Sequence, residues 1–122
     1  MDRLSLIKAL QVGQTALELI DKLDTRDWRY ASELKLLFED SARGCFNNST
    51  WINLQVKWGH VKKPEKLAFN IYLASRAILD IMSIKSNESW KNKCISNLIK
   101  DLKLTCNKLI IELNKLNESK NG

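Results

Sequence analysis

Turn-forming residues are scarce in this chain, which has one proline and four glycines among its 122 residues. That scarcity leaves little room for the many tight turns of an all-β domain and favours a few long helices. The sequence also lacks any run of about 18 apolar residues, the length that a membrane-spanning helix requires. No apolar run follows a basic start at the N-terminus, so we expect no secretory signal and predict a cytoplasmic protein.

Residue types that bind metals or perform catalysis are few as well. The three cysteines, Cys45, Cys94 and Cys106, form no CxxC pair, and the single histidine, His60, makes a zinc site hard to build. A histidine-based catalytic triad would depend on His60 alone, and no glycine-rich phosphate-binding loop is present. We therefore predict no enzyme, no metal site and no cofactor, and expect the thiols to be reduced, buried small hydrophobes.

Positive charge is abundant but unevenly distributed. The chain is 44% hydrophobic and 28% charged, as expected for one globular domain, and its net charge is +6. Residues 1–40 carry six Lys/Arg and eight Asp/Glu, whereas residues 41–122 carry fourteen and six. A basic C-terminal two thirds favours an anionic partner, with nucleic acid ahead of a membrane surface, although the same charge can serve solubility alone.

The longest amphipathic pattern runs from Asn87 to Leu116 and predicts a helix with one apolar and one basic face. Steps of three, four and seven residues place six aliphatic side chains on one stripe: Ile95, Leu98, Leu102, Leu109, Leu113 and Leu116. At 100° per residue, four lysines fall roughly opposite that stripe: Lys93, Lys100, Lys108 and Lys115. Ile111 lies among these lysines, and an apolar residue in that place indicates a contact on the basic face.

The same periodicity predicts three further helices, over residues 3–23, 26–43 and 64–84. The apolar face of the first comprises Leu6, Leu10, Leu17 and Ile20, with Ala9, Gly13 and Ala16 beside them. The apolar face of the second comprises Ala31, Leu34, Phe38, Ala42 and Cys45. The apolar face of the third comprises Leu67, Ile71, Ala74, Ile78 and Met82. Asp24 and Thr25 are expected to end the first helix and cap the second. Pro64 suits the first turn of the third.

Residues 46–63 form the least helical part of the chain. Ile52, Leu54, Val56 and Trp58 alternate with polar residues. Period two favours a short strand or hairpin arm against the bundle, while the alternative is a continuation of the second helix. We therefore predict an all-α, up-down four-helix bundle over residues 1–116, with a frayed tail at residues 117–122. The connection between helices two and three is long, and the first of the two interpretations makes it extended.

Lysines and tryptophans also gather around this connection. The basic residues are Lys57, His60, Lys62, Lys63 and Lys66, and they are interleaved with Trp51 and Trp58. Basic groups contact phosphates and aromatic faces stack on bases, so the cluster is a candidate nucleic-acid site with Trp58 as a stacking residue. In the alternative interpretation, the tryptophans fill the bundle and the lysines are merely solvated.

The third predicted helix has apolar residues on a second side. Phe69 and Leu73 project away from its core stripe and bracket Arg76 and Asp80. A helix that is apolar on two sides either lies deep in a core or carries a second interface. In a domain of this size we expect an interface formed by Phe69, Leu73 and Arg76, with Ile111 of the fourth helix as a further contact.

Several short segments give the chain a family likeness, spread over about residues 6–116. They are Ala16-Leu17-Glu18-Leu19, Ala42-Arg43 followed by Asn47-Asn48, Lys66-Leu67-Ala68-Phe69, and Leu73-Ala74-Ser75-Arg76-Ala77. With its leucine-rich final helix, the chain resembles the four-helix-bundle proteins encoded by 23S rRNA intervening sequences, which are related to the accessory variability protein (Avd) of diversity-generating retroelements. The family's Ser-Ile-Pro segment and the Ala-Glu-Gly that usually follows are absent, and the connection from Asn48 to Pro64 is longer.

The resemblance implies a homo-oligomeric basic bundle, with the Avd branch binding nucleic acid and a reverse transcriptase. It supplies no catalytic residue. Our leading hypothesis is a small basic adaptor that binds RNA or DNA, as an accessory subunit of a reverse transcriptase or another nucleic-acid enzyme. The predicted contacts are Lys57, Trp58, Lys62, Lys63, Lys66, Lys93, Lys100, Lys108 and Lys115. The alternative is a protein–protein interaction, immunity or inhibitor module whose lysines serve only solubility; neither hypothesis involves a membrane.

Overall fold

The computed structural model describes residues 2–43, 45–46, 63–85 and 89–121 and shows the predicted all-α four-helix bundle. Its helices are α1 (Arg3–Lys22), α2 (Trp28–Arg43), α3 (Lys63–Met82) and α4 (Ser89–Asn121), with a short 3-10 helix, η1 (Leu23–Thr25), between α1 and α2. No strand occurs within these ranges. The alternation between Ile52 and Trp58 lies outside the described residues, so the choice between strand and helix there stays a prediction.

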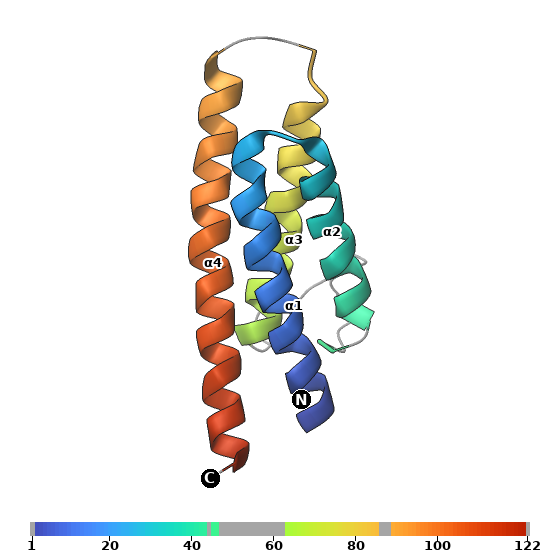
Figure 1. Cartoon of the computed structure of the whole chain (residues 1–122), viewed down its shortest axis with the longest axis vertical. Coiled ribbons are helices and arrows are strands. Elements are labelled where there is room, and N and C mark those ends of the chain that lie inside the picture. The colour runs from blue at the N-terminus through green and yellow to red at the C-terminus, as the bar shows by residue number, and fades with distance from the viewer. Residues whose placement is uncertain (1, 44, 47–62, 86–88, 122) are drawn as a thin grey trace.

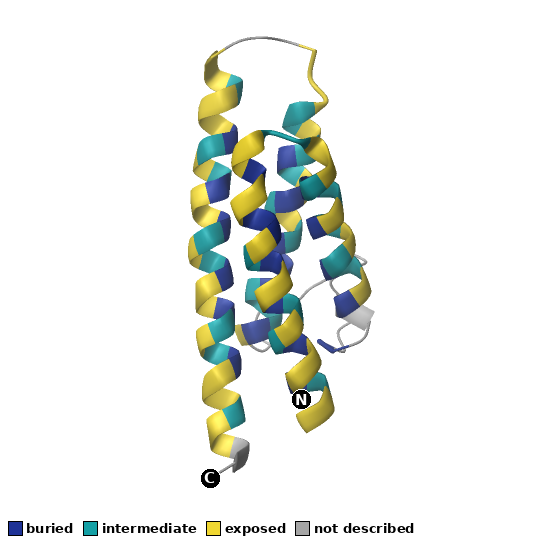
Figure 2. Cartoon of the chain, viewed as in Figure 1, coloured by how far each residue is buried: buried dark blue, intermediate teal, exposed yellow. Residues whose placement is uncertain are grey.

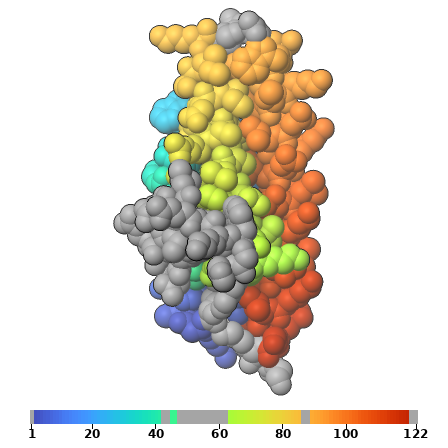
Figure 3. Space-filling view, turned by 180° about the vertical axis from the view of Figure 1, so that it is seen from behind, coloured from blue at the N-terminus to red at the C-terminus, as the bar shows by residue number. Residues whose placement is uncertain are grey.

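The four helices are arranged around one shared core. α1 packs against α2 and α4, and α3 packs against the same two helices. Successive helices run in opposite directions along the bundle (Figure 1). α4 has 33 residues and is therefore about 50 Å long, and it runs the whole length of one edge of the molecule (Figure 3).

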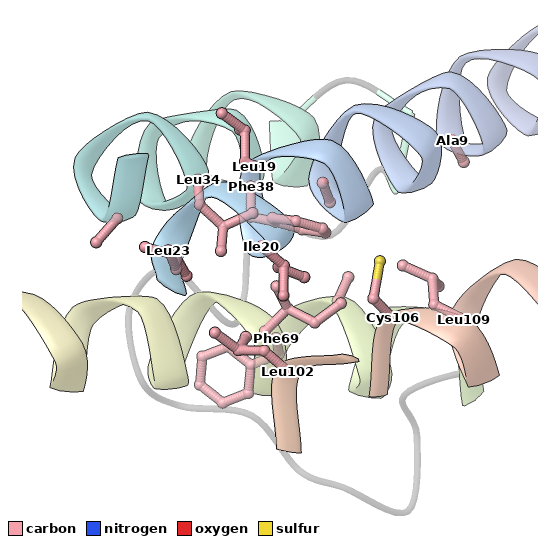
Figure 4. Packing of buried hydrophobic residues seen from close by; sticks show 14 of the residues in the cluster. Ala9, Leu19, Ile20, Leu23, Leu34, Phe38, Phe69, Leu102, Cys106 and Leu109 are labelled. Carbon is pink, nitrogen blue, oxygen red and sulfur yellow. The ribbon is translucent and has the colours of Figure 1, made fainter. Parts of the chain in front are cut away.

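The core is built largely from the stripes that the periodicity predicted. The prediction is wrong for Leu116, which is 37% exposed because it lies near the C-terminal end of α4, beyond the last fully buried residue of that helix, Leu113. Side chains of all four helices point toward one another, among them Ile20, Phe38 and Leu102 (Figure 4). The fully buried large side chains are Phe38, Phe46, Leu6, Ile20, Leu23, Leu34, Ile71, Ile78, Leu102, Leu109 and Leu113. Leu10, Leu17, Leu67, Ala74, Met82 and Leu98 pack partly buried at the edge of this core. Each helix thus hides one face and shows the other (Figure 2).

Several helix boundaries differ from their predicted positions: α1 ends one residue earlier, α3 is shifted by one to two residues at its ends, and the start of α2 and the end of α4 differ as follows. α2 begins at Trp28 rather than Arg26, because Arg26 has a left-handed backbone with φ of 62°. The backbone N–H of Arg29 donates to the Asp27 carboxylate at 3.0 Å, so Asp27 caps α2 in place of Asp24 or Thr25. At the other end of the chain, α4 continues through Asn121, beyond the predicted end at Leu116.

Gly13 lies at a close approach of α1 to α4. A Cβ atom at this position would stand 2.9 Å from Cγ1 of Ile110 in α4. The thiol of Cys106, also in α4, donates to the Gly13 carbonyl oxygen at 3.4 Å. The missing side chain therefore allows α4 to pack closely against α1 at this position.

Candidate functional site

The outer face of α4 carries a line of exposed lysines. Lys93, Lys100, Lys108 and Lys115 are all exposed. They fall within about 80° of one another around the helix axis, pointing away from the buried residues Ile95, Leu102 and Leu109. Neighbouring lysines are seven or eight residues apart, so their Cα atoms are spaced about 11 Å along the axis and the line extends over about 33 Å. We call these four residues the lysine line.

Most of the lysine line is not neutralised by nearby carboxylates. Among the described residues, Lys93, Lys100 and Lys108 form no ion pair. Lys115 lies 3.4 Å from the Glu112 carboxylate, and both side chains reach solvent. Solvent-exposed cations without partners keep their full hydration and charge, and are free to pair with an anionic ligand.

Glu112 connects the lysine line to the start of α3. Its carboxylate lies 3.2 Å from Nζ of Lys63, the first residue of α3. The hydrogen bond from Lys63, together with that from Lys115, holds the pKa of Glu112 below its usual value. Lys63 and Lys115 thus share the single carboxylate of Glu112, and this group of three side chains keeps one net positive charge.

Apolar side chains alternate with the lysines on the same face. Leu104 is 62% exposed and Ile111 is 53% exposed. They lie seven residues apart, so they point in nearly the same direction as the lysine line. The sequence analysis identified Ile111 but missed Leu104, although the same helical projection places it between Lys100 and Lys108. The aromatic side chain of Trp90, in the first turn of α4, is also exposed.

Only part of the second predicted basic cluster lies among the described residues. Lys63 and Lys66 occupy the first turn of α3, where Lys63 is exposed and Lys66 is half-buried. Lys57, Trp58 and Lys62 lie outside the described residues, as do Trp51 and His60. The structure therefore brings Lys63 to the lysine line through Glu112, and the stacking role of Trp58 stays a prediction.

The predicted interface on α3 is wrong for Phe69. This side chain is only 5% exposed and stacks against Tyr72, with ring centroids 6.3 Å apart. Leu73 is 38% exposed, and Arg76 is exposed as expected. A helical projection reports only a direction relative to the helix's own core stripe, and it contains no tertiary contact that could bury a residue on another side. Phe69 therefore belongs to the core of the bundle.

The cysteines differ from one another in their surroundings. Burial raises the pKa of Cys106 to about 12 and also raises that of Cys45. Cys94 is exposed, beside Lys93 in the second turn of α4, so the expectation that all three thiols are buried is wrong for this one. The projection of α4 places Cys94 well away from the core stripe, and that signal was present in the sequence.

A shallow groove lies between α1 and α2. Its volume is about 400 Å³, and its lining combines Lys8 and Asp40 with the apolar residues Val12, Leu37 and Cys45. In the described part of the chain, no three histidine, cysteine or carboxylate residues come together as metal ligands would. None of the helices described is both long and apolar enough to cross a membrane.

No family model, curated protein or solved structure matches the chain. The resemblance to the intervening-sequence and Avd proteins therefore stays a prediction.

Proposed function

We propose that the chain is a nucleic-acid-binding adaptor whose lysine line contacts the phosphates of RNA or DNA. The observation that carries this proposal is the alignment of Lys93, Lys100, Lys108 and Lys115 along one exposed face, three of them without an ion pair in the described structure. Lysine contacts phosphate as a flexible point charge, so it needs no matched geometry from its partner.

The bundle makes α4 a suitable support for such contacts. Isolated helices gain little stability from propensity alone, whereas α4 is held by packing against α1 and α3 along its buried face. The lysines are therefore presented on a straight frame over about 33 Å, close to one turn of duplex DNA. Contacts of this kind supply affinity without reading base sequence.

The family resemblance adds the role of accessory subunit to this proposal. In that role the bundle would hold RNA or DNA for a reverse transcriptase or another nucleic-acid enzyme. The rival function is a protein-interaction or inhibitor module that acts through the Phe69/Leu73 face or through residues 52–58. The burial of Phe69 weakens the first of these surfaces, and the second lies outside the described residues.

Fluorescence anisotropy with labelled RNA and DNA oligonucleotides at low ionic strength tests the proposal. We expect Lys100→Glu/Lys108→Glu to weaken binding by at least about tenfold, since two phosphate contacts are lost and two repulsive charges are added. Lys8→Glu/Lys22→Glu is the matched control, because these exposed lysines lie on the α1–α2 side, where Lys8 lines the groove and Lys22 lies over the Tyr30 ring. Undetectable binding by the unmodified chain, or equal losses in both variants, would contradict it.

A further inference from the structure

Leu104 and Ile111 are not explained by the core or by phosphate contacts. Both point away from the buried stripe of α4 and are more than half exposed, so they contribute little to the packing of the bundle. A phosphate backbone offers an aliphatic side chain no apolar counterpart, and bases stack on aromatic rings, which leucine and isoleucine lack. Scattered single apolar residues need no explanation, but these two are aligned seven residues apart.

The exposed aliphatic pair and the lysines beside it together indicate which kind of partner can bind this face. Two aliphatic side chains at heptad spacing match the apolar seam of an amphipathic helix. Lys100 and Lys108 flank Leu104, while Lys108 and Lys115 flank Ile111. A partner helix whose seam is bordered by carboxylates would bury the aliphatic pair and pair with these lysines at the same time.

A second copy of the same face is a poor occupant. Two α4 helices packed through Leu104 and Ile111 would bring eight lysines of the two lysine lines together. Like charges across such a seam are destabilising and act against self-pairing. Charge complementarity therefore favours a partner with acidic flanks.

We propose that the outer face of α4 docks an acidic amphipathic helix of another protein, with Leu104 and Ile111 as its apolar anchors. The docked helix and nucleic acid need the same lysines, so each displaces the other. The docking depends on Leu104 and Ile111, which the nucleic-acid proposal does not use, and the two proposals can therefore fail separately.

The probe is a designed peptide of about four heptads with leucine at the seam positions and glutamate beside them. A second peptide of the same composition, with its leucines moved off the seam, measures attraction by charge alone. Isothermal titration of the full chain at physiological salt should show the heptad peptide binding at least about tenfold more tightly than the scrambled one, because only the former buries the aliphatic pair. Equal affinities would overturn the proposal.

Surface variants of the chain locate the binding site. Leu104→Gln/Ile111→Gln should lower the affinity for the heptad peptide at least about tenfold and leave oligonucleotide binding unchanged. Leu4→Gln/Leu36→Gln is the matched control, since it removes two equally exposed leucines from α1 and α2. Circular dichroism establishes that both variants remain helical. A larger loss in the control than in the α4 variant would contradict docking on this face.

Light scattering tests whether a second copy of the chain occupies this face. If the chain self-associates and Leu104→Gln/Ile111→Gln abolishes that association, the occupant is a second copy and the proposal is overturned. Loss of oligonucleotide binding in Lys100→Glu/Lys108→Glu, with no effect of the Leu104/Ile111 pair on peptide binding, would support the nucleic-acid function and reject the docked helix.

Discussion

The three cysteines are expected to differ in reactivity because they differ in burial. The thiolate is the reactive form of cysteine, and burial opposes its formation. Cys106 is fully buried, and its raised pKa of about 12 leaves very little thiolate at neutral pH. Cys45 is buried as well, whereas Cys94 is exposed.

Thiol labelling should report this difference directly. In the folded chain at neutral pH, we expect Cys94 to react quickly with a maleimide or disulfide reagent and the other two thiols to react slowly. All three should react once denaturant unfolds the chain. Mass spectrometry of the labelled peptides makes the measurement. Fast labelling of Cys106 in the folded chain would mean that α1 and α4 do not pack as described.

The absence of a side chain at Gly13 is another property of a single residue. Glycine inside a helix costs about 1 kcal/mol relative to alanine, so its presence in α1 needs a compensating reason. That reason is Ile110, whose Cγ1 would lie 2.9 Å from an added Cβ.

A double-mutant cycle tests the close approach of α1 and α4. Gly13→Ala alone should destabilise the chain or leave it unchanged, because overpacking of about 1–3 kcal/mol offsets the gain in helix propensity. In the background of Ile110→Ala, which removes the clashing atom, Gly13→Ala should stabilise by up to about 1 kcal/mol. Urea unfolding of the four chains measures the coupling. Equal effects in both backgrounds would show that Gly13 is not held against Ile110.

At the scale of elements, periodicity predicted the helices but not how they begin. The four apolar stripes were readable because burial on one side repeats every 3.6 residues. The left-handed backbone of Arg26 could not be read from the sequence, because arginine rarely adopts positive φ and is not a typical turn residue. Arg26 is the left-handed C-cap of η1, and its backbone N–H donates to the Leu23 carbonyl oxygen at 2.9 Å. Its guanidinium also donates to the Ser96 hydroxyl at 2.7 Å, which links the α1–α2 turn to α4.

The contact between Arg26 and Ser96 makes a prediction of its own. Ser96→Ala should destabilise the chain by about 0.5–1.5 kcal/mol, as a partly buried hydrogen bond is lost. Arg26→Gly should cost less, because glycine adopts positive φ without strain and offsets the same loss. In the Arg26→Gly background, Ser96→Ala should then be close to neutral. Thermal unfolding of the single and double variants checks this, and additive losses would refute the link.

The elements of the site were predictable to different degrees. The helical projection of α4 alone predicts the lysine line. The same projection also places Leu104 beside the lysine line and Cys94 away from the core stripe. The burial of Phe69 did not follow, because tertiary contacts decided it. The meeting of Lys63 and Lys115 at Glu112 joins residues about 50 positions apart, which no local pattern contains.

At the scale of the whole molecule, opposite corners of the bundle differ in charge. α4 carries the lysine line, whereas α2, which lies between α1 and α3, combines three basic and three acidic residues. Within the basic region, Glu112 is a carboxylate that reduces the positive potential near Lys63 and Lys115. Its ion pairs reach solvent, so they contribute little to stability.

Removing that carboxylate should therefore tighten the binding of nucleic acid. We expect Glu112→Gln to raise oligonucleotide affinity by about threefold at moderate salt, roughly the effect of one added phosphate contact. Glu33→Gln, which removes an exposed carboxylate from α2, is the control with the same change of charge. Anisotropy titrations compare the two. An equal gain in the control would show that net charge, rather than the face of α4, governs the affinity.

The salt dependence of binding tests the central claim most directly. For the unmodified chain, the logarithm of the affinity should fall linearly with the logarithm of the salt concentration, because each phosphate contact releases counterions. Replacing Lys93, Lys100, Lys108 and Lys115 by glutamine should reduce the magnitude of that slope by about 3. A slope that stays the same after all four replacements would show that nucleic acid is not held by the outer face of α4.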